Sequence, residues 1–103
     1  MVMQDLTFVT FHIDGTKDLW TPERTGDYAA DIALGNDYAA ELILFIRATS
    51  NASFFGAVLR TITRKGVYGP TEIGFCNAIG VTLVGLNWIE PASSAVKPLS
   101  AAA

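Results

Sequence analysis

An apolar stripe between residues 28 and 46 is the feature that most constrains the fold of this chain. Its members fall within about 100° of arc at 3.6 residues per turn. The stripe consists of Tyr28, Ile32, Gly35, Ala39, Leu42, Ile43 and Ile46. Because the stripe keeps its phase across Gly35, it predicts one long amphipathic helix that reaches about Thr49. Gly35 would allow a close backbone approach to a neighbouring helix.

The tripeptide Thr21-Pro22-Glu23 is typical of a helix start. Threonine is a favourable N-cap, proline is tolerated at the first helical position, and an acid suits the first turn. We therefore expect the long helix to begin near Pro22.

The N-terminal segment predicts a β-hairpin. Residues 6–13 are dense in β-branched and aromatic side chains and are followed by Asp14-Gly15, which is typical of a two-residue type I′ turn. Such a turn pairs Ile13 with Thr16. The strand face expected to pack on the helices carries Val9, Phe11, Ile13 and Trp20.

Two more helices are expected after residue 50. The first covers about residues 54–65 and ends at Gly66, with five side chains inward: Phe54, Phe55, Val58, Leu59 and Ile62. The second, residues 70 to about 88, is apolar nearly all round, so it belongs in a core or a subunit interface. The β-branched run at 81–89 leaves open a third strand that completes a small sheet.

The overall prediction is an α+β fold, with an N-terminal β-hairpin followed by a small bundle of about three helices. We expect a single domain over residues 1–90. From Pro91 the composition changes to Ala, Ser, Pro and Lys, which predicts a flexible tail over residues 91–103.

The apolar content predicts self-association. Half of the 103 residues are hydrophobic and 17% are charged, whereas a chain this short buries only about 60–65% of its unfolded surface. Residues 1–45 hold eight acidic and two basic side chains, and residues 46–103 hold two acidic and five basic ones. We expect a homo-oligomer, most simply a dimer. The charge asymmetry favours two differently charged solvated faces, and the alternative is that these complementary charges steer the self-association. The net charge of −3 argues against a nucleic-acid partner.

The cellular setting predicted from the sequence is the cytoplasm. Cys76 is the only cysteine, so no intrachain disulfide can form, and the first residues lack the pattern of a signal peptide. The uncharged run between Glu72 and Glu90 is 17 residues long and contains asparagine and glycine, so we expect no membrane span.

Candidates for chemistry are few. His12 is the sole histidine and Cys76 the sole thiol, which makes them the catalytic candidates. Cys76 lies among apolar residues, where we expect a buried, inert thiol. A zinc site needs three or four ligands, so we expect no metal, and no motif suggests a cofactor.

Candidate ligand-binding residues are Tyr28, Tyr38, Arg47, Arg60 and Arg64. Arg60 and Arg64 share a helix face, and guanidinium groups suit carboxylates and phosphates. A pocket between the hairpin and the helices could use His12, Tyr28, Tyr38 and Arg47 as polar groups.

These observations favour a small cytoplasmic, self-associating interaction or regulatory protein without catalytic activity. One alternative is a small-ligand-binding protein or small enzyme with a pocket between hairpin and helices. Another is a DNA-associated regulator, because residues 72–88 have a spacing similar to a helix-turn-helix. Its recognition segment would offer only Thr82 and Asn87 to base edges.

Overall fold

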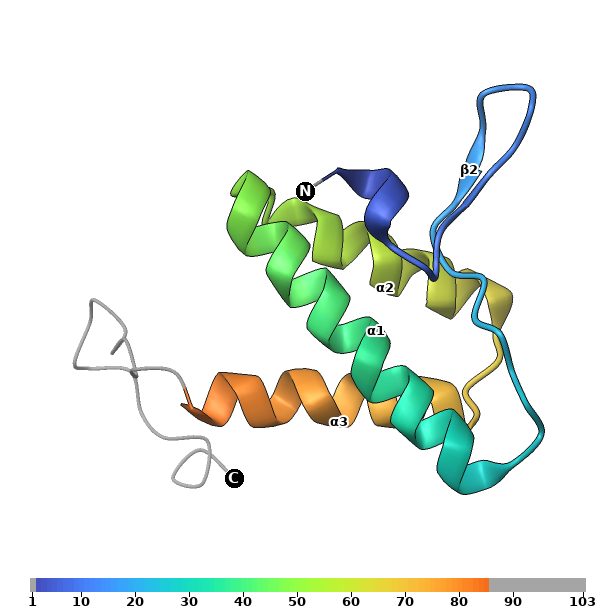
Figure 1. Ribbon diagram of the computed structural model, residues 1–103, viewed down its shortest axis with the longest axis vertical. Coiled ribbons are helices and arrows are strands. Elements are labelled where there is room, and N and C mark those ends of the chain that lie inside the picture. The colour runs from blue at the N-terminus through green and yellow to red at the C-terminus, as the bar shows by residue number, and fades with distance from the viewer. Residues whose placement is uncertain (1, 86–103) are drawn as a thin grey trace, which may run out of the picture.

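The computed structural model describes residues 2–85 as a hairpin followed by three helices (Figure 1). The elements in chain order are a 3-10 helix η1 (Met3–Asp5), strands β1 (Thr10–Phe11) and β2 (Lys17–Asp18), and helices α1 (Tyr28–Thr49), α2 (Ser53–Lys65) and α3 (Pro70–Gly85). The predicted α+β fold is confirmed. The predicted domain end at residue 90 and the tail 91–103 lie outside the described residues.

Helix α1 runs unbroken through Gly35 and crosses α3 at backbone contact (Figure 1). A Cβ placed on Gly35 would lie 2.1 Å from the carbonyl oxygen of Thr71, and one on Gly74 would lie 2.1 Å from that of Ile32. No side chain fits between the two helices at this crossing. The predicted single helix and the close approach at Gly35 are both confirmed.

The predicted start of α1 near Pro22 is wrong, because the helix begins at Tyr28. The preceding segment is instead held by side chains of α1. The backbone N–H of Glu23 donates to the Tyr38 hydroxyl at 3.0 Å, and the N–H and hydroxyl of Thr25 both donate to Asp31 at 2.8 Å. Hydrogen bonds from the Thr25 backbone and hydroxyl also lower the pKa of Asp31.

The hairpin forms, but its register differs by one residue from the prediction. Phe11 pairs with Lys17, and the N–H of His12 donates to the carbonyl of Thr16, which leaves a loop of three residues ending at Gly15. Of the loop residues only Gly15 has a positive φ, +88°, whereas a type I′ turn needs two. Of the strand face predicted to pack on the helices, Val9 and Trp20 are buried. Phe11 and Ile13 are exposed, so the prediction is wrong for these two, because the hairpin projects away from the helices beyond its base (Figure 1).

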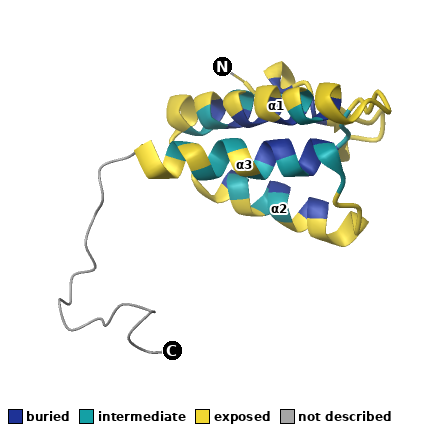
Figure 2. Cartoon of the chain, turned by 90° about the horizontal axis from the view of Figure 1, so that it is seen from below, coloured by how far each residue is buried: buried dark blue, intermediate teal, exposed yellow. Residues whose placement is uncertain are grey.

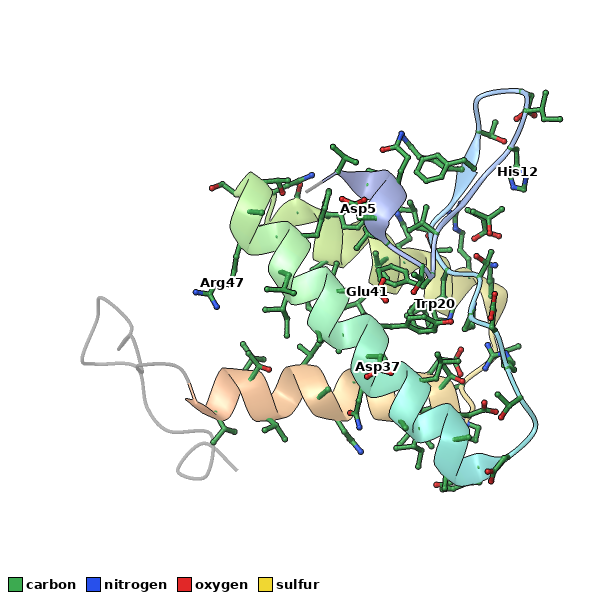
Figure 3. All side chains as sticks on the ribbon, in the orientation of Figure 1. Asp5, His12, Trp20, Asp37, Glu41 and Arg47 are labelled. Carbon is green, nitrogen blue, oxygen red and sulfur yellow. The ribbon has the colours of Figure 1, made fainter. Side chains whose placement is uncertain are left out.

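The core forms where the base of the hairpin meets the helices. Four aromatic rings, from Phe8, Trp20, Tyr38 and Phe75, lie with centroids 4.7–6.3 Å apart. Around them lie further buried side chains: Leu6, Val9, Ala39, Leu42, Phe45, Phe54, Val58 and Ile62. Figure 3 shows Trp20 at the foot of the hairpin, close to α1 and α2. The hairpin itself projects away from the helices (Figure 1).

Helices α2 and α3 follow the predicted ranges closely. Helix α2 ends at Gly66, whose φ is +71° and whose N–H donates to the carbonyls of Ile62 and Thr63. Residues 81–85 are helical, so the alternative of a third strand is wrong there, and residues 86–89 lie outside the described range. Within residues 2–85, no helix combines the length and apolar character needed to span a bilayer.

Candidate functional site

A cleft of about 550 Å³ lies between the hairpin and α2, and we call it the basic cleft. Its walls are formed by His12, Thr16, Lys17, Asp18, Leu19, Thr61, Arg64 and Lys65. A pocket thus lies between hairpin and helix, as one of the predicted alternatives required. His12 lines it, whereas Tyr28, Tyr38 and Arg47 do not.

The basic cleft has an excess of positive charge. It holds three cations, Lys17, Arg64 and Lys65, against the single carboxylate of Asp18. Lys65 is already engaged, because its Nζ lies 2.7 Å from Asp18 and also donates to the carbonyl of Trp20. Burial opposes ionisation of Asp18, but the hydrogen bonds from Lys65 and from the N–H of Trp20, together with the positive charge of Lys65, outweigh it and lower the pKa of the carboxyl. Lys17 and Arg64 form no ion pair within the described part of the chain.

An apolar groove of about 420 Å³ lies between the C-terminal halves of α1 and α3. It is lined by Ile43, Ile46, Arg47, Ile79, Thr82 and Leu83. Arg47 is the one charged residue in this set. Three further aliphatic side chains of the same two helix segments are exposed: Leu44, Val81 and Val84. Figure 2 shows that α3 is buried in its N-terminal half and exposed in its last turns.

The two catalytic candidates are not brought together. His12 is exposed on the hairpin, whereas Cys76 is half-buried and lines a separate cavity of about 270 Å³ on α2 and α3. That cavity also holds Tyr68, whose pKa is raised by the neighbouring Cys76 thiol and by burial. No nucleophile–base pair of Cys76 and His12 exists in this fold.

The binding candidates scatter over the molecule. Tyr28 is exposed on the first turn of α1, and Tyr38 is buried in the core, where burial raises its pKa. Figure 3 shows His12 and Arg47 at opposite ends of the molecule. Arg64 lines the basic cleft, but Arg60, one turn earlier on α2, does not. Arg47 therefore does not join the arginines of α2 in one basic cluster.

Sequence reasoning missed Lys17 and Asp18 as members of the cleft. Their only sequence signal was the turn glycine two residues before Lys17, which places β2 beside β1. Nothing in the sequence indicated that the hairpin would stand beside the last turn of α2.

A buried ionic network was also missed. The carboxylate of Glu72 is fully buried, and it accepts hydrogen bonds from Trp20 Nε1 at 2.8 Å, Arg24 at 2.9 Å and the N–H of Gly69 at 2.8 Å. Burial opposes its ionisation, but these hydrogen bonds prevail and lower the pKa of Glu72 to about 2. All its oxygens are engaged, so this network stabilises the fold and offers nothing to a ligand.

Metal chemistry finds no support in the described residues. Between residues 2 and 85, no group of three or more His, Cys, Asp and Glu side chains is placed to hold a metal ion.

Comparisons with protein-family models, curated proteins and solved structures found no match to this chain. The features of residues 2–85 that bear most on function are therefore the basic cleft and the apolar groove.

Proposed function

We propose that this protein is a small cytoplasmic interaction protein that forms a homodimer through the apolar groove and the last turns of α3. The observation that supports this is the aliphatic surface left uncovered there. Val84, Val81 and Leu83 are 86%, 72% and 62% exposed. Covering an exposed valine or leucine contributes roughly 1.5–3 kcal/mol. The free thiol of Cys76 suits a reducing cytoplasm.

A second copy of the same chain offers both an apolar groove and exposed aliphatic side chains to cover it. The groove lies beside the exposed end of α3, and both features recur on every copy. A two-fold interface uses the same patch on both subunits. In such a dimer the end of α3 in each subunit would fill the groove of the other.

Two charges of α1 that lack an ion pair within residues 2–85 are consistent with self-association. Arg47 at the rim has no ion-pair partner within residues 2–85, and neither does Asp37, which is exposed on the same helix. Each can pair with the opposite charge on a second copy. Such a pair at the rim would steer the encounter and set its register more than it would add affinity.

Sedimentation equilibrium of the full chain tests the proposal. At micromolar concentration we expect a species of twice the 11.0 kDa of one chain. Leu83→Lys, which places a charge in the groove, should shift the chain to the monomer. Ile13→Lys is the matched control, because Ile13 is an equally aliphatic, fully exposed side chain at the hairpin tip.

Two outcomes contradict the proposal. One is a monomer at every concentration of the natural sequence. The other is dissociation by Ile13→Lys to the same degree as by Leu83→Lys, which would place the contact outside the groove.

A further inference from the structure

We propose that the basic cleft binds a small organic phosphate, a phosphate monoester in its dianionic form. This site lies on the hairpin and α2, and it does not depend on the dimer proposed above. Three cations against one carboxylate leave two positive charges in excess within a chain whose net charge is −3. A phosphate monoester dianion matches that excess.

The two uncommitted cations stand on separate elements that line the same cleft. Lys17 belongs to β2 and Arg64 to the last turn of α2. The planar guanidinium of Arg64 can donate to two phosphate oxygens at once, and Lys17 supplies a compact charge. His12 adds a polar group at the hairpin side, whereas the N–H and hydroxyl of Thr16 already donate to Asp14. A phosphate between hairpin and helix would thus be contacted from both sides.

The cleft is held in place before any ligand binds. Lys65 joins α2 to the hairpin by its ion pair with Asp18 and its hydrogen bond to the carbonyl of Trp20. Arg64 forms no ion pair within residues 2–85, so its guanidinium is free to bind an anion.

The size and charge of the surroundings favour a small molecule over a nucleic acid. The cleft volume of about 550 Å³ lies within the roughly 300–1,000 Å³ of small-ligand sites. Duplex binding needs several phosphate contacts along a continuous basic surface. Asp14 is exposed at the hairpin tip next to the cleft, and the first 45 residues carry eight acids, so a polyanion would be repelled.

Amide NMR of the full chain, titrated with inorganic phosphate and then glycerol phosphate at constant ionic strength, tests the inference. We expect saturable shifts confined to residues 16–19 and 61–65, with a Kd on the order of 1 mM for these probes. Arg64→Ala or Lys17→Ala should weaken binding about tenfold, because each removes a charge-assisted hydrogen bond. Both side chains are exposed, so the fold should tolerate either change.

Arg60→Ala is the matched control. It removes the same charge from the same helix one turn away, and Arg60 lies outside the cleft. The phosphate affinity of the Arg60→Ala variant should therefore stay within about twofold of that of the natural chain. Equal weakening by Arg60→Ala, or the absence of saturable shifts at these residues, would overturn the inference. Retention of duplex DNA that disappears in Arg64→Ala would replace the small phosphate with a nucleic acid.

The dimer and the phosphate site can be separated. Leu83→Lys should abolish self-association and leave the phosphate titration unchanged, because the groove and the basic cleft share no residue. Loss of phosphate binding in the Leu83→Lys variant would contradict the inference that the phosphate site is independent of the dimer.

Discussion

The two ends of the α1–α3 pair differ sharply although the same two helices form both. At the N-terminal end the backbones touch at Gly35 and Gly74, and the carboxylate of Glu72 is fully buried. At the C-terminal end the same helices leave a groove of about 420 Å³, with Leu83 and Val84 exposed beside it. We refer to these as the closed end and the open end.

The closed end is built from glycine and an ionic network, whereas the open end carries the larger aliphatic side chains. Burial therefore does not follow the density of apolar residues along these helices. It follows the distance between the two backbones, which is shortest where side chains are absent. The apolar residues of the open end remain available for another molecule.

The largest effect is expected from Gly35→Ala at the closed end. The added Cβ would meet backbone atoms of Thr71 and Phe75 at 2.1 and 2.6 Å, and backbone cannot move aside as a flexible side chain can. We expect a loss of about 3 kcal/mol or more in the free energy of unfolding, measured by urea denaturation. Gly80→Ala is the control on α3, where a Cβ meets nothing within 4 Å. It should stabilise the protein by up to about 1 kcal/mol; equal destabilisation by both changes would disprove the contrast.

A smaller but substantial effect is expected from Glu72→Gln. The pKa of this carboxyl is lowered from 4.5 to about 2 in the folded state, so its ionised form adds stability above pH 4.5. That stability, about 3 kcal/mol, is lost as the pH falls through about 2. Glu72→Gln should therefore lower the free energy of unfolding at pH 7, and it should flatten the decrease of that free energy between pH 5 and 2.

Glu41 is the control, because its carboxylate accepts hydrogen bonds from Thr7 at the surface. Glu41→Gln should cost less than about 1 kcal/mol at pH 7. A pH profile unchanged by Glu72→Gln would contradict the role of the network.

The smallest effect is expected at the open end. Val84 is 86% exposed, so Val84→Lys should change the unfolding free energy of the monomer by no more than about 0.5 kcal/mol. The free energy of unfolding should be measured by adding Val84→Lys to the Leu83→Lys variant, which is expected to be monomeric, so that self-association does not affect the result. A loss of several kcal/mol there would mean that Val84 packs within its own chain.

The sequence predicted the extents of the helices better than it predicted which of their side chains are buried. The continuous helix through Gly35 and the end of α2 at Gly66 were both expected and are confirmed. The apolar stripe was only partly right, because Tyr28 is exposed while Tyr38 and Phe45 are buried. Tyr38 is buried because its ring packs against Phe8 and Trp20, and a hydrogen bond from the N–H of Glu23 satisfies its hydroxyl there. The spacing of apolar residues on one helix does not reveal such partners.

The sequence identified candidate site residues one by one, but it did not predict which of them lie together in one site. His12 and Arg64 were each recognised as candidates, and the structure places both at the basic cleft. Arg47, which the pocket alternative grouped with His12, lies instead at the apolar groove. The cleft forms because the hairpin lies beside the last turn of α2, and it brings together residues more than 40 positions apart, such as Lys17 and Arg64.

The sequence by itself determined the hairpin, the long helix α1 and the end of α2, because these depend on turn glycines and on the repeat of side chains within one segment. Only the tertiary structure decided the partner of Gly35, the two surface sites and the buried network. The bond from Trp20 to Glu72 joins residues 52 positions apart. Such contacts depend on how separate elements pack, and short-range preferences carry no information about that packing.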